Sequence, residues 1–125
     1  MTYYQQEVHR LQSALYPHAH QRRQVLVARQ FIEQHYAEAI GLLEMAEAAC
    51  CSKFHFLRLF RQYYGRTPHQ YLTALRLRQA RRRLLGGAPV AEACQAVGFD
   101  SVTSFTGLFR RTYGCPPRAL AARRR

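Results

Sequence analysis

Arginine is the residue type with which this chain is best equipped to do chemistry. Its 19 basic residues are all arginines except Lys53, they are set against only 7 acidic residues, and the formal net charge is +12. The planar guanidinium presents its N–H donors in a fork that suits bidentate contacts to phosphate and to guanine. Together with a pI near 10.5, this excess indicates a polyanionic partner more strongly than a merely solvated surface.

Two of the arginines belong to a sequence repeat. The pattern Phe-x-x-Leu-Phe-Arg-x-x-Tyr-Gly-x-x-Pro runs from Phe56 to Pro68 and again from Phe105 to Pro117. Such a repeat marks two copies of one supersecondary unit. Each copy is too small to bury its own apolar face, so the pair should share one fold. Two positively charged copies favour a partner whose negative charge also repeats, and duplex nucleic acid fits best.

Other chemistries find little support in the sequence. The 7 acidic residues form no carboxylate pair, and the chain contains neither a nucleophile–base motif nor a phosphate-binding glycine-rich loop. We therefore expect neither an enzyme nor a cofactor. His18 and His20 lack a nearby cysteine or carboxylate that could complete a metal site. The sequence predicts no metal centre.

The cysteines and the apolar runs bear on the cellular compartment. The four cysteines show no C-x-x-C spacing, and we interpret them as small apolar side chains, with a thiol switch at Cys50-Cys51 as the alternative. The amino terminus lacks the pattern of a secretory signal, and no apolar run approaches the ~20 residues needed to span a bilayer. The sequence predicts a cytoplasmic protein that does not contact the membrane. The cysteines are Cys50, Cys51, Cys94 and Cys115.

The helices that must position the arginines can be inferred from apolar periodicity. No alternating strand pattern occurs, so we expect an all-α fold. From Val25 onward a helical stripe begins, and a short second helix follows it. Their apolar positions are Val25, Ala28, Phe31, Ile32 and Tyr36, and then Ile40, Leu42, Met45, Ala46 and Ala49.

Capping residues give the ends of the later helices. Ser52 stands where an N-cap belongs, and Gly65 should end the helix that follows it. Pro68 opens a long helix that continues to Leu85, with Tyr71, Leu75, Leu84 and Leu85 as candidates for burial. Pro89 begins another short helix, and either Asp100 or Ser101 caps the last long one.

A short helix, a tight turn and a second helix thus occur twice, which is the helix-turn-helix arrangement. In each unit the second helix keeps one face free to enter a major groove about 12 Å wide. The expected inward residues are Phe56, Leu59, Phe60 and Tyr63 in the first unit, and Phe105 and Phe109 in the second. The expected exposed residues are Lys53, Phe54, Leu57, Arg58 and Arg61, and then Val102, Thr103, Thr106, Gly107 and Arg110.

The two units and the long helix between them resemble the DNA-binding domain of the AraC/XylS family of bacterial transcription regulators. The resemblance covers about residues 25–120. It rests on Ser52-x-x-His55-Phe56-x-Arg58-x-Phe60-Arg61 with Gly65 and Pro68, on Arg76-x-x-x-Ala80, on Val97-Gly98-Phe99-Asp100, and on the paired Phe-Arg…Gly…Pro endings. It implies about seven helices in a homeodomain-like fold, with two recognition helices in successive major-groove segments.

The residue pattern and the resemblance together predict an order of domains. An N-terminal arm or extra helix (1–24) precedes a first helix-turn-helix subdomain (25–67). A linker helix (68–85) then leads to a second helix-turn-helix subdomain (86–120) and a basic tail (121–125).

Candidate base contacts follow from the match to the family's motif. Arg58 is the strongest of them, because arginine contacts guanine through two hydrogen bonds that provide ~1–3 kcal/mol of discrimination. The second unit offers side chains suited to thymine methyl groups and weak hydrogen bonds. The expected set is Lys53, Phe54, Leu57, Arg58, Val102, Thr103, Thr106 and Gly107.

Candidate phosphate contacts lie near the ends of the recognition units. Such contacts position a protein on the duplex without specifying its sequence. His55 is interpreted as either structural or a phosphate contact. The expected set is Ser52, His55, Arg61, Arg66, Ser101, Arg110, Arg111 and Arg118. Five arginines of the linker helix are interpreted as a solvated face, with phosphate contact as the alternative; they are Arg76, Arg78, Arg81, Arg82 and Arg83.

The chain departs from the family's pattern at two positions. Gly107 stands where members usually carry a long polar side chain, so we expect the second half-site to be recognised loosely, by backbone approach and shape. Cys50 occupies a place in the first turn where the second turn has Gly98, which commonly requires a positive φ. Either Cys50 accepts strain or the first turn is built differently.

The sequence therefore predicts a bacterial transcription factor that binds double-stranded DNA as a monomer, with RNA polymerase as a second partner implied by the resemblance. One alternative is the DNA-binding fragment of a larger effector-sensing regulator. A second is a sequence-indifferent architectural or RNA-binding protein, and a third is a protein-only adaptor. A specific regulator should prefer its site over other DNA by at least ~10³.

Overall fold

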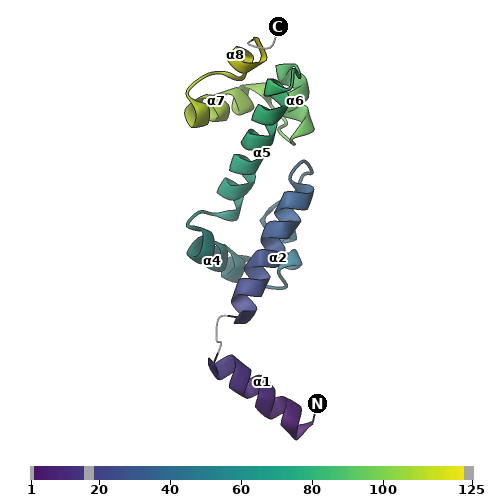
Figure 1. The fold of residues 1–125 in the computed structure, drawn as a ribbon, viewed down its shortest axis with the longest axis vertical. Coiled ribbons are helices and arrows are strands. Elements are labelled where there is room, and N and C mark those ends of the chain that lie inside the picture. The colour runs from purple at the N-terminus through teal and green to yellow at the C-terminus, as the bar shows by residue number, and fades with distance from the viewer. Residues whose placement is uncertain (1, 16–18, 123–125) are drawn as a thin grey trace.

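The structure, a computed structural model, describes residues 2–15 and 19–122. Within these residues it consists of α-helices and contains no strand (Figure 1). The all-α expectation is confirmed: helices α2 to α8 are the seven that the resemblance implies, and α1 lies in the expected arm. The helices are α1 (Tyr3–Leu15), α2 (Ala19–His35), α3 (Leu42–Ala48), α4 (Lys53–Tyr64), α5 (Pro68–Leu85), α6 (Val90–Ala96), α7 (Val102–Tyr113) and α8 (Pro117–Ala122).

Helix α2 begins at Ala19, well before the apolar stripe that starts at Val25. Its first turns, AHQRRQ, carry no apolar pattern, but Gln and Arg are good helix formers and extend the helix. The helix thus continues into the segment expected as an arm. Of the proposed histidine pair, His18 lies outside the described residues, and no group of three or more possible metal ligands occurs among those described. None of the described helices is long and apolar enough to cross a membrane.

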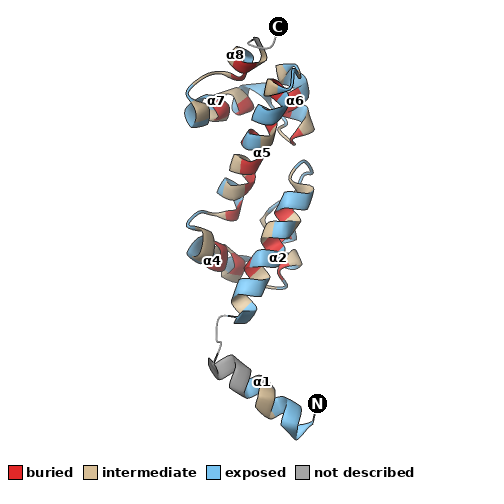
Figure 2. Ribbon diagram, in the orientation of Figure 1, coloured by how far each residue is buried: buried red, intermediate tan, exposed pale blue. Residues whose placement is uncertain are grey.

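The first hydrophobic core lies between α2, α3, α4 and the start of α5 (Figure 2). Phe56 and Phe60 of α4 are fully buried in it, and Val25, Ala28 and Ile32 of α2 belong to the same cluster. These residues recur at helical spacing in both segments, which is why the two helices bury one face each. The predicted stripe of α2 is confirmed at its centre.

The second core lies between α6, α7, α8 and the end of α5. Phe105 and Phe109 of α7 are fully buried, as Phe56 and Phe60 are in α4. Ala93 and Cys94 of α6 lie in the same cluster. The burial of Cys94 agrees with its interpretation as a small apolar side chain.

Helix α5 belongs to both cores. Leu72 and Leu75 lie in the first cluster, and Leu77, Ala80 and Leu84 lie in the second. One continuous helix therefore holds the two helix-turn-helix units. Some residues predicted to be buried are only half-buried at the edges of the cores: Tyr63, Tyr71 and Leu85.

Serine side chains cap both recognition helices. Ser52 Oγ accepts a hydrogen bond of 3.2 Å from the backbone N–H of His55. Ser101 Oγ accepts one of 3.2 Å from the N–H of Ser104, so Ser101 rather than Asp100 is the cap of α7. Each hydroxyl satisfies a backbone donor that would otherwise lack a partner in the first turn.

The two helix-turn-helix turns differ in length by one residue. Ala49 to Ser52 connect α3 to α4, whereas Val97 to Ser101 connect α6 to α7. Both turns contain a residue with positive φ, which is 56° at Cys50 and 97° at Gly98. Cys50 therefore accepts the left-handed conformation that its side chain disfavours. The first turn is also built differently, since it is one residue shorter, so both alternatives left open by the sequence hold.

Because an L-residue in the left-handed region is strained, Cys50→Gly is expected to stabilise the protein by about 0.5–1 kcal/mol, a gain reduced by the greater freedom of glycine in the unfolded chain. The free energy of unfolding, measured by urea titration, tests this expectation. Cys50→Ala is the control, because it removes the thiol but keeps a Cβ. A glycine variant no more stable than the alanine variant would mean that the turn carries no strain.

Candidate nucleic-acid interface

The first half of α4 presents the candidate base contacts of the first unit. Phe54 is 73% exposed, so it belongs to the surface and not to the edge of the core. The ammonium of Lys53 lies 5.3 Å from the centroid of the Phe54 ring. Arg58, one helical turn further, is also exposed. Three side chains that could reach base edges or phosphates thus share the free surface of this helix.

Leu57 differs from its neighbours on α4. It is half-buried and lines a pocket of about 100 Å³ together with Ile40, Leu42, Met45 and His69. Part of the Leu57 side chain therefore faces α3, the helix before α4. Leu57 offers a base a smaller apolar contact than Phe54 does.

The matching surface of α7 carries shorter side chains than that of α4. Val102 is 46% exposed, Thr103 is exposed and Thr106 is half-buried. Gly107 is exposed, and a Cβ added there would find no atom within 4 Å. Arg111 Nε donates a hydrogen bond of 3.4 Å to the carbonyl of Gly107. The structure places the predicted residues of α7 together, but they carry no long polar side chain in the middle of the helix.

The candidate phosphate contacts are mostly exposed. Ser52 and Ser101 use their hydroxyls as helix caps, and each hydroxyl still has a proton to donate. His55 is half-buried, and its backbone N–H is already bonded to Ser52. The exposed arginines are Arg61, Arg66, Arg110, Arg111 and Arg118.

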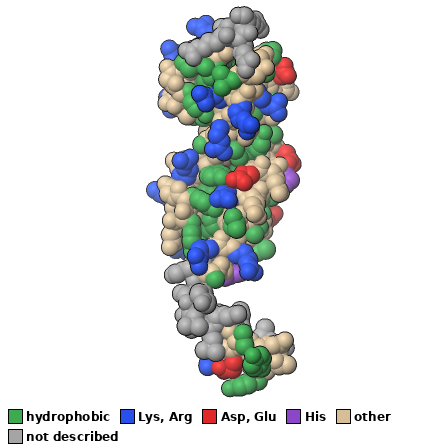
Figure 3. Space-filling model, viewed as in Figure 1, with side chains coloured by type: hydrophobic (Ala, Val, Ile, Leu, Met, Phe, Trp, Pro, Cys, Tyr) green, Lys and Arg blue, Asp and Glu red, His purple; other side chains and the backbone are tan. Residues whose placement is uncertain are grey.

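The positive charge is spread over the length of the molecule. Figure 3 shows Lys and Arg side chains from the lower end of the body formed by α2 to α8 up to its opposite end, with few acidic side chains among them. Helices α4 and α7 lie at opposite ends of α5 and both extend to the left in Figure 1. The geometry can therefore present two helices and many cations to one extended polyanion.

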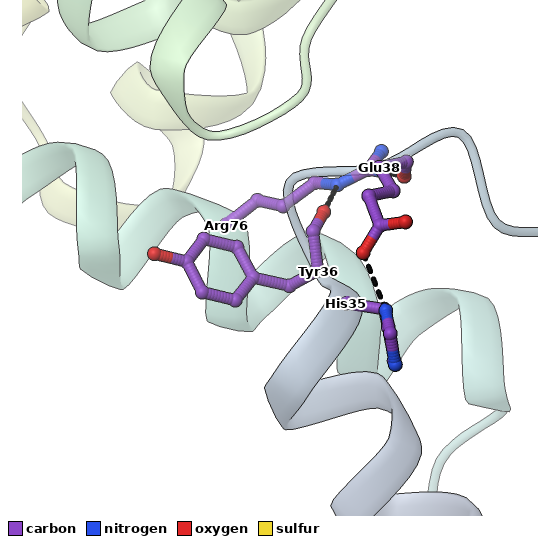
Figure 4. Close-up of polar contacts among 4 residues, drawn as sticks. All are labelled: His35, Tyr36, Glu38 and Arg76. Carbon is purple, nitrogen blue, oxygen red and sulfur yellow. Dashed lines mark hydrogen bonds and ion pairs between the residues drawn. The ribbon is translucent and has the colours of Figure 1, made fainter.

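Arg76 of the linker helix was predicted to lie on a solvated face, and this prediction is wrong. Arg76 is half-buried, and its Nε donates a hydrogen bond of 2.6 Å to the carbonyl of Tyr36 (Figure 4). Its Nη2 donates one of 2.8 Å to the carbonyl of Glu38. Burial lowers the pKa of the guanidinium, an effect that Asp100 opposes through its negative charge. Sequence periodicity gave no sign of this role.

The other linker arginines are exposed, as predicted. Arg81 also lies over the ring of Tyr113, with its Cζ 5.2 Å from the ring centroid. Such a cation–π contact supports the packing of α7 on α5. The remaining exposed arginines of this helix are Arg78, Arg82 and Arg83.

A polar cluster that the sequence did not reveal ties α2 to α4 and α5. The hydroxyl of Tyr71 donates a hydrogen bond of 2.9 Å to Glu33 Oε1. Arg29 pairs with the same carboxylate at 3.5 Å, and its Cζ lies 5.8 Å from the centroid of the Tyr64 ring. Burial first, and then the contact with Glu33, raise the pKa of Tyr71 to about 12. The cluster is structural and holds the first unit against the linker helix.

Two helix-turn-helix units on one linker helix, each with an exposed recognition helix, define a DNA-binding helix-turn-helix protein. A family model described as a helix-turn-helix domain matches residues 45–123. The chain belongs to the AraC-type family of helix-turn-helix transcriptional regulators.

Individual relatives agree with this assignment. The chain is 34% identical over 98 residues, or 78% of its length, to the probable transcriptional regulator LumQ of Photobacterium leiognathi. An AraC-type DNA-binding domain protein from Chromobacterium violaceum superimposes with a TM-score of 0.75 at 28% identity, covering 82% of this chain and 93% of that one. The DNA-binding domain of AdpA, solved with a target DNA, gives a TM-score of 0.74 at 31% identity and covers 78% of this chain and 89% of that one.

The curated relatives are longer than this chain. The match covers 40% of LumQ and 28% of the regulator YbfI of Bacillus subtilis. The chain thus spans less than half the length of these two relatives.

Proposed function

We propose that this chain is a sequence-specific regulator of transcription that inserts α4 and α7 into successive major-groove segments of double-stranded DNA. The observation that carries the proposal is the pair of exposed recognition helices fixed to one helix, α5. The 18 residues of α5 span roughly 27 Å at ~1.5 Å per residue. This is the scale of the ~34 Å repeat of the duplex.

The likeness to the DNA-binding domain of AdpA supports the proposal, because that domain was solved in complex with a target DNA. By analogy, Arg58 contacts a guanine, while Lys53 and Phe54 contact neighbouring bases. Val102, Thr103 and Thr106 form the second contact surface. The exposed arginines at the ends of the units contact phosphates.

The protein binds its site as a monomer, because one chain carries both recognition helices. Its action on DNA places it in the bacterial cytoplasm, at the nucleoid. RNA polymerase is a second partner by family resemblance alone.

Binding to a randomised duplex pool at near-physiological salt, followed by sequencing of the retained DNA, tests the proposal. An asymmetric site with two patches about one helical turn apart is the expected result. Retention of DNA without an enriched sequence would favour the architectural or RNA-binding alternative. No retention would favour a protein-only role or dependence on a further domain.

Gly107 determines how specifically the second half-site is recognised. Without a side chain at this position, α7 has nothing long to place in the middle of its groove, so the second patch should be degenerate. Gly107→Arg is expected to tighten binding and to make the second patch more specific. The arginine should discriminate in favour of one guanine by ~1–3 kcal/mol. The space around the missing Cβ is open, so the substitution introduces no clash.

The same selection, repeated with Gly107→Arg, measures this effect. Gly107→Ala is the control, since it restores the helix propensity of about 1 kcal/mol without adding a donor. An unchanged second patch in the arginine variant would count against the argument.

A further inference from the structure

The two helix-turn-helix units meet at the end of α2. Tyr36, one residue beyond that helix, packs against both hydrophobic clusters. Its carbonyl accepts the hydrogen bond from Arg76 Nε, and the carbonyl of Glu38 accepts the bond from Arg76 Nη2. In the same turn the Glu38 carboxylate pairs with Nδ1 of His35 (Figure 4). Arg76 therefore joins α5 to the turn that follows α2.

The turn that precedes α7, Val97 to Ser101, packs against the same contact between Arg76 and Tyr36. A Cβ at Gly98 would lie 3.0 Å from the carbonyl of Ala37 and 3.1 Å from both Arg76 Nε and the carbonyl of Tyr36. Phe99, the next residue, has its ring centroid 6.0 Å from Arg76 Cζ. Glycine is required here for close approach as well as for its φ of 97°. The guanidinium thus lies half-buried between the first unit and the turn of the second.

The chemistry of this contact favours one fixed geometry. The carbonyls of Tyr36 and Glu38 both lie in the turn after α2, where the Glu38 carbonyl also accepts a backbone hydrogen bond of 2.8 Å from Ile40. The planar guanidinium of Arg76 binds both carbonyls at once. Partial burial makes the bond to the Tyr36 carbonyl harder to replace with water, whereas the bond to the Glu38 carbonyl is exposed. Two directional bonds to backbone atoms restrict rotation of one unit against the other better than apolar contact alone.

We propose that Arg76 is a positioning residue that fixes the relative orientation of α4 and α7, and thereby the spacing between the two half-sites that the protein accepts. The proposal rests on the proposed function. In this proposal Arg76 contacts no base. It affects DNA binding only through the contact between the two units. One inserted base pair moves the second half-site by ~3.4 Å and rotates it by about 34°. A rigid pair of units should tolerate this poorly.

The experiment uses Gly107→Arg as its reference protein, because a degenerate second patch would not register a change of spacing. It measures affinity for the site selected by that protein and for versions with one base pair added or removed between the half-sites. The reference protein is expected to prefer its own spacing by roughly tenfold or more, and Arg76→Ala in the same background to lower that preference below about threefold. Arg78→Ala is the matched control, because it removes the same charge from the exposed side of the same helix. It should keep the preference of the reference protein.

The ratio between spacings, and not the affinity itself, is decisive, because a lost phosphate contact would weaken all sites equally. If Arg76→Ala is not helical at the assay temperature by circular dichroism, Arg76→Lys decides, since lysine keeps the charge but cannot hold both carbonyls in a planar fork. Arg76→Lys should show a preference for the native spacing that lies between those of the reference protein and Arg76→Ala. An unchanged ratio in the folded Arg76 variant overturns the inference, and so does indifference to spacing in the Gly107→Arg reference protein. Absence of specific binding by the wild type would instead overturn the proposed function.

Discussion

Replacing Arg58 with alanine is expected to weaken binding to the selected site by about 1–3 kcal/mol, or roughly 5- to 150-fold in Kd. Arg58 is exposed on the free surface of α4, and Ser52 caps the start of that helix. A guanidinium placed there can donate two parallel hydrogen bonds to one guanine. The loss should be confined to the specific site, because a base contact contributes little to binding of unrelated DNA.

Fluorescence anisotropy with the selected duplex and a scrambled one provides the measurement. Arg66→Ala is the comparison, because Arg66 is an exposed arginine beyond the end of α4 and a proposed phosphate contact. That variant should weaken both duplexes alike and reduce the salt slope by about one. Equal loss on both duplexes for Arg58→Ala would show that Arg58 contacts a phosphate and not a base.

The second large effect concerns stability. Phe60→Ala is expected to lower the free energy of unfolding by about 3–5 kcal/mol, because it leaves a cavity in the first core. Phe60 is 0% exposed. Its ring centroid lies 5.7 Å from that of Phe56, 4.7 Å from Tyr64 and 5.6 Å from Tyr71. A loss of this size is a large part of the 5–15 kcal/mol typical of a small domain.

Urea denaturation followed by circular dichroism measures this effect. Phe54→Ala is the control, because it removes the same ring from the same helix at a position that is 73% exposed. Its change should stay within about 0.5 kcal/mol. Similar losses in both variants would mean that α4 buries a different face, which would also remove the basis for the proposed DNA contacts of Arg58.

Local features of the sequence predicted most of the helical framework. The repeat, the helical spacing of Phe56, Phe60, Phe105 and Phe109, the cap at Ser52 and the start of α5 at Pro68 agree with the structure. These signals act within a turn or two of one helix, so the chain itself carries them. The linker helix was predicted with its observed ends, because a proline opens it and a glycine pair closes it. The roles of the candidate DNA contacts stay predictions.

Only the tertiary structure decided what lies between the elements. Arg76 and Arg78 stand two residues apart with the same chemistry, yet Arg76 is held by backbone carbonyls of the turn after α2 while Arg78 is exposed. Tyr71 reaches Glu33 across 38 positions of sequence, and Arg76 reaches Tyr36 across 40. Composition and periodicity describe the face of a helix but not its neighbour, because which surface meets it depends on how the whole chain packs. The sequence by itself therefore determined most of the helices and their charge. Packing decided which arginine joins the two units and which remain available to DNA.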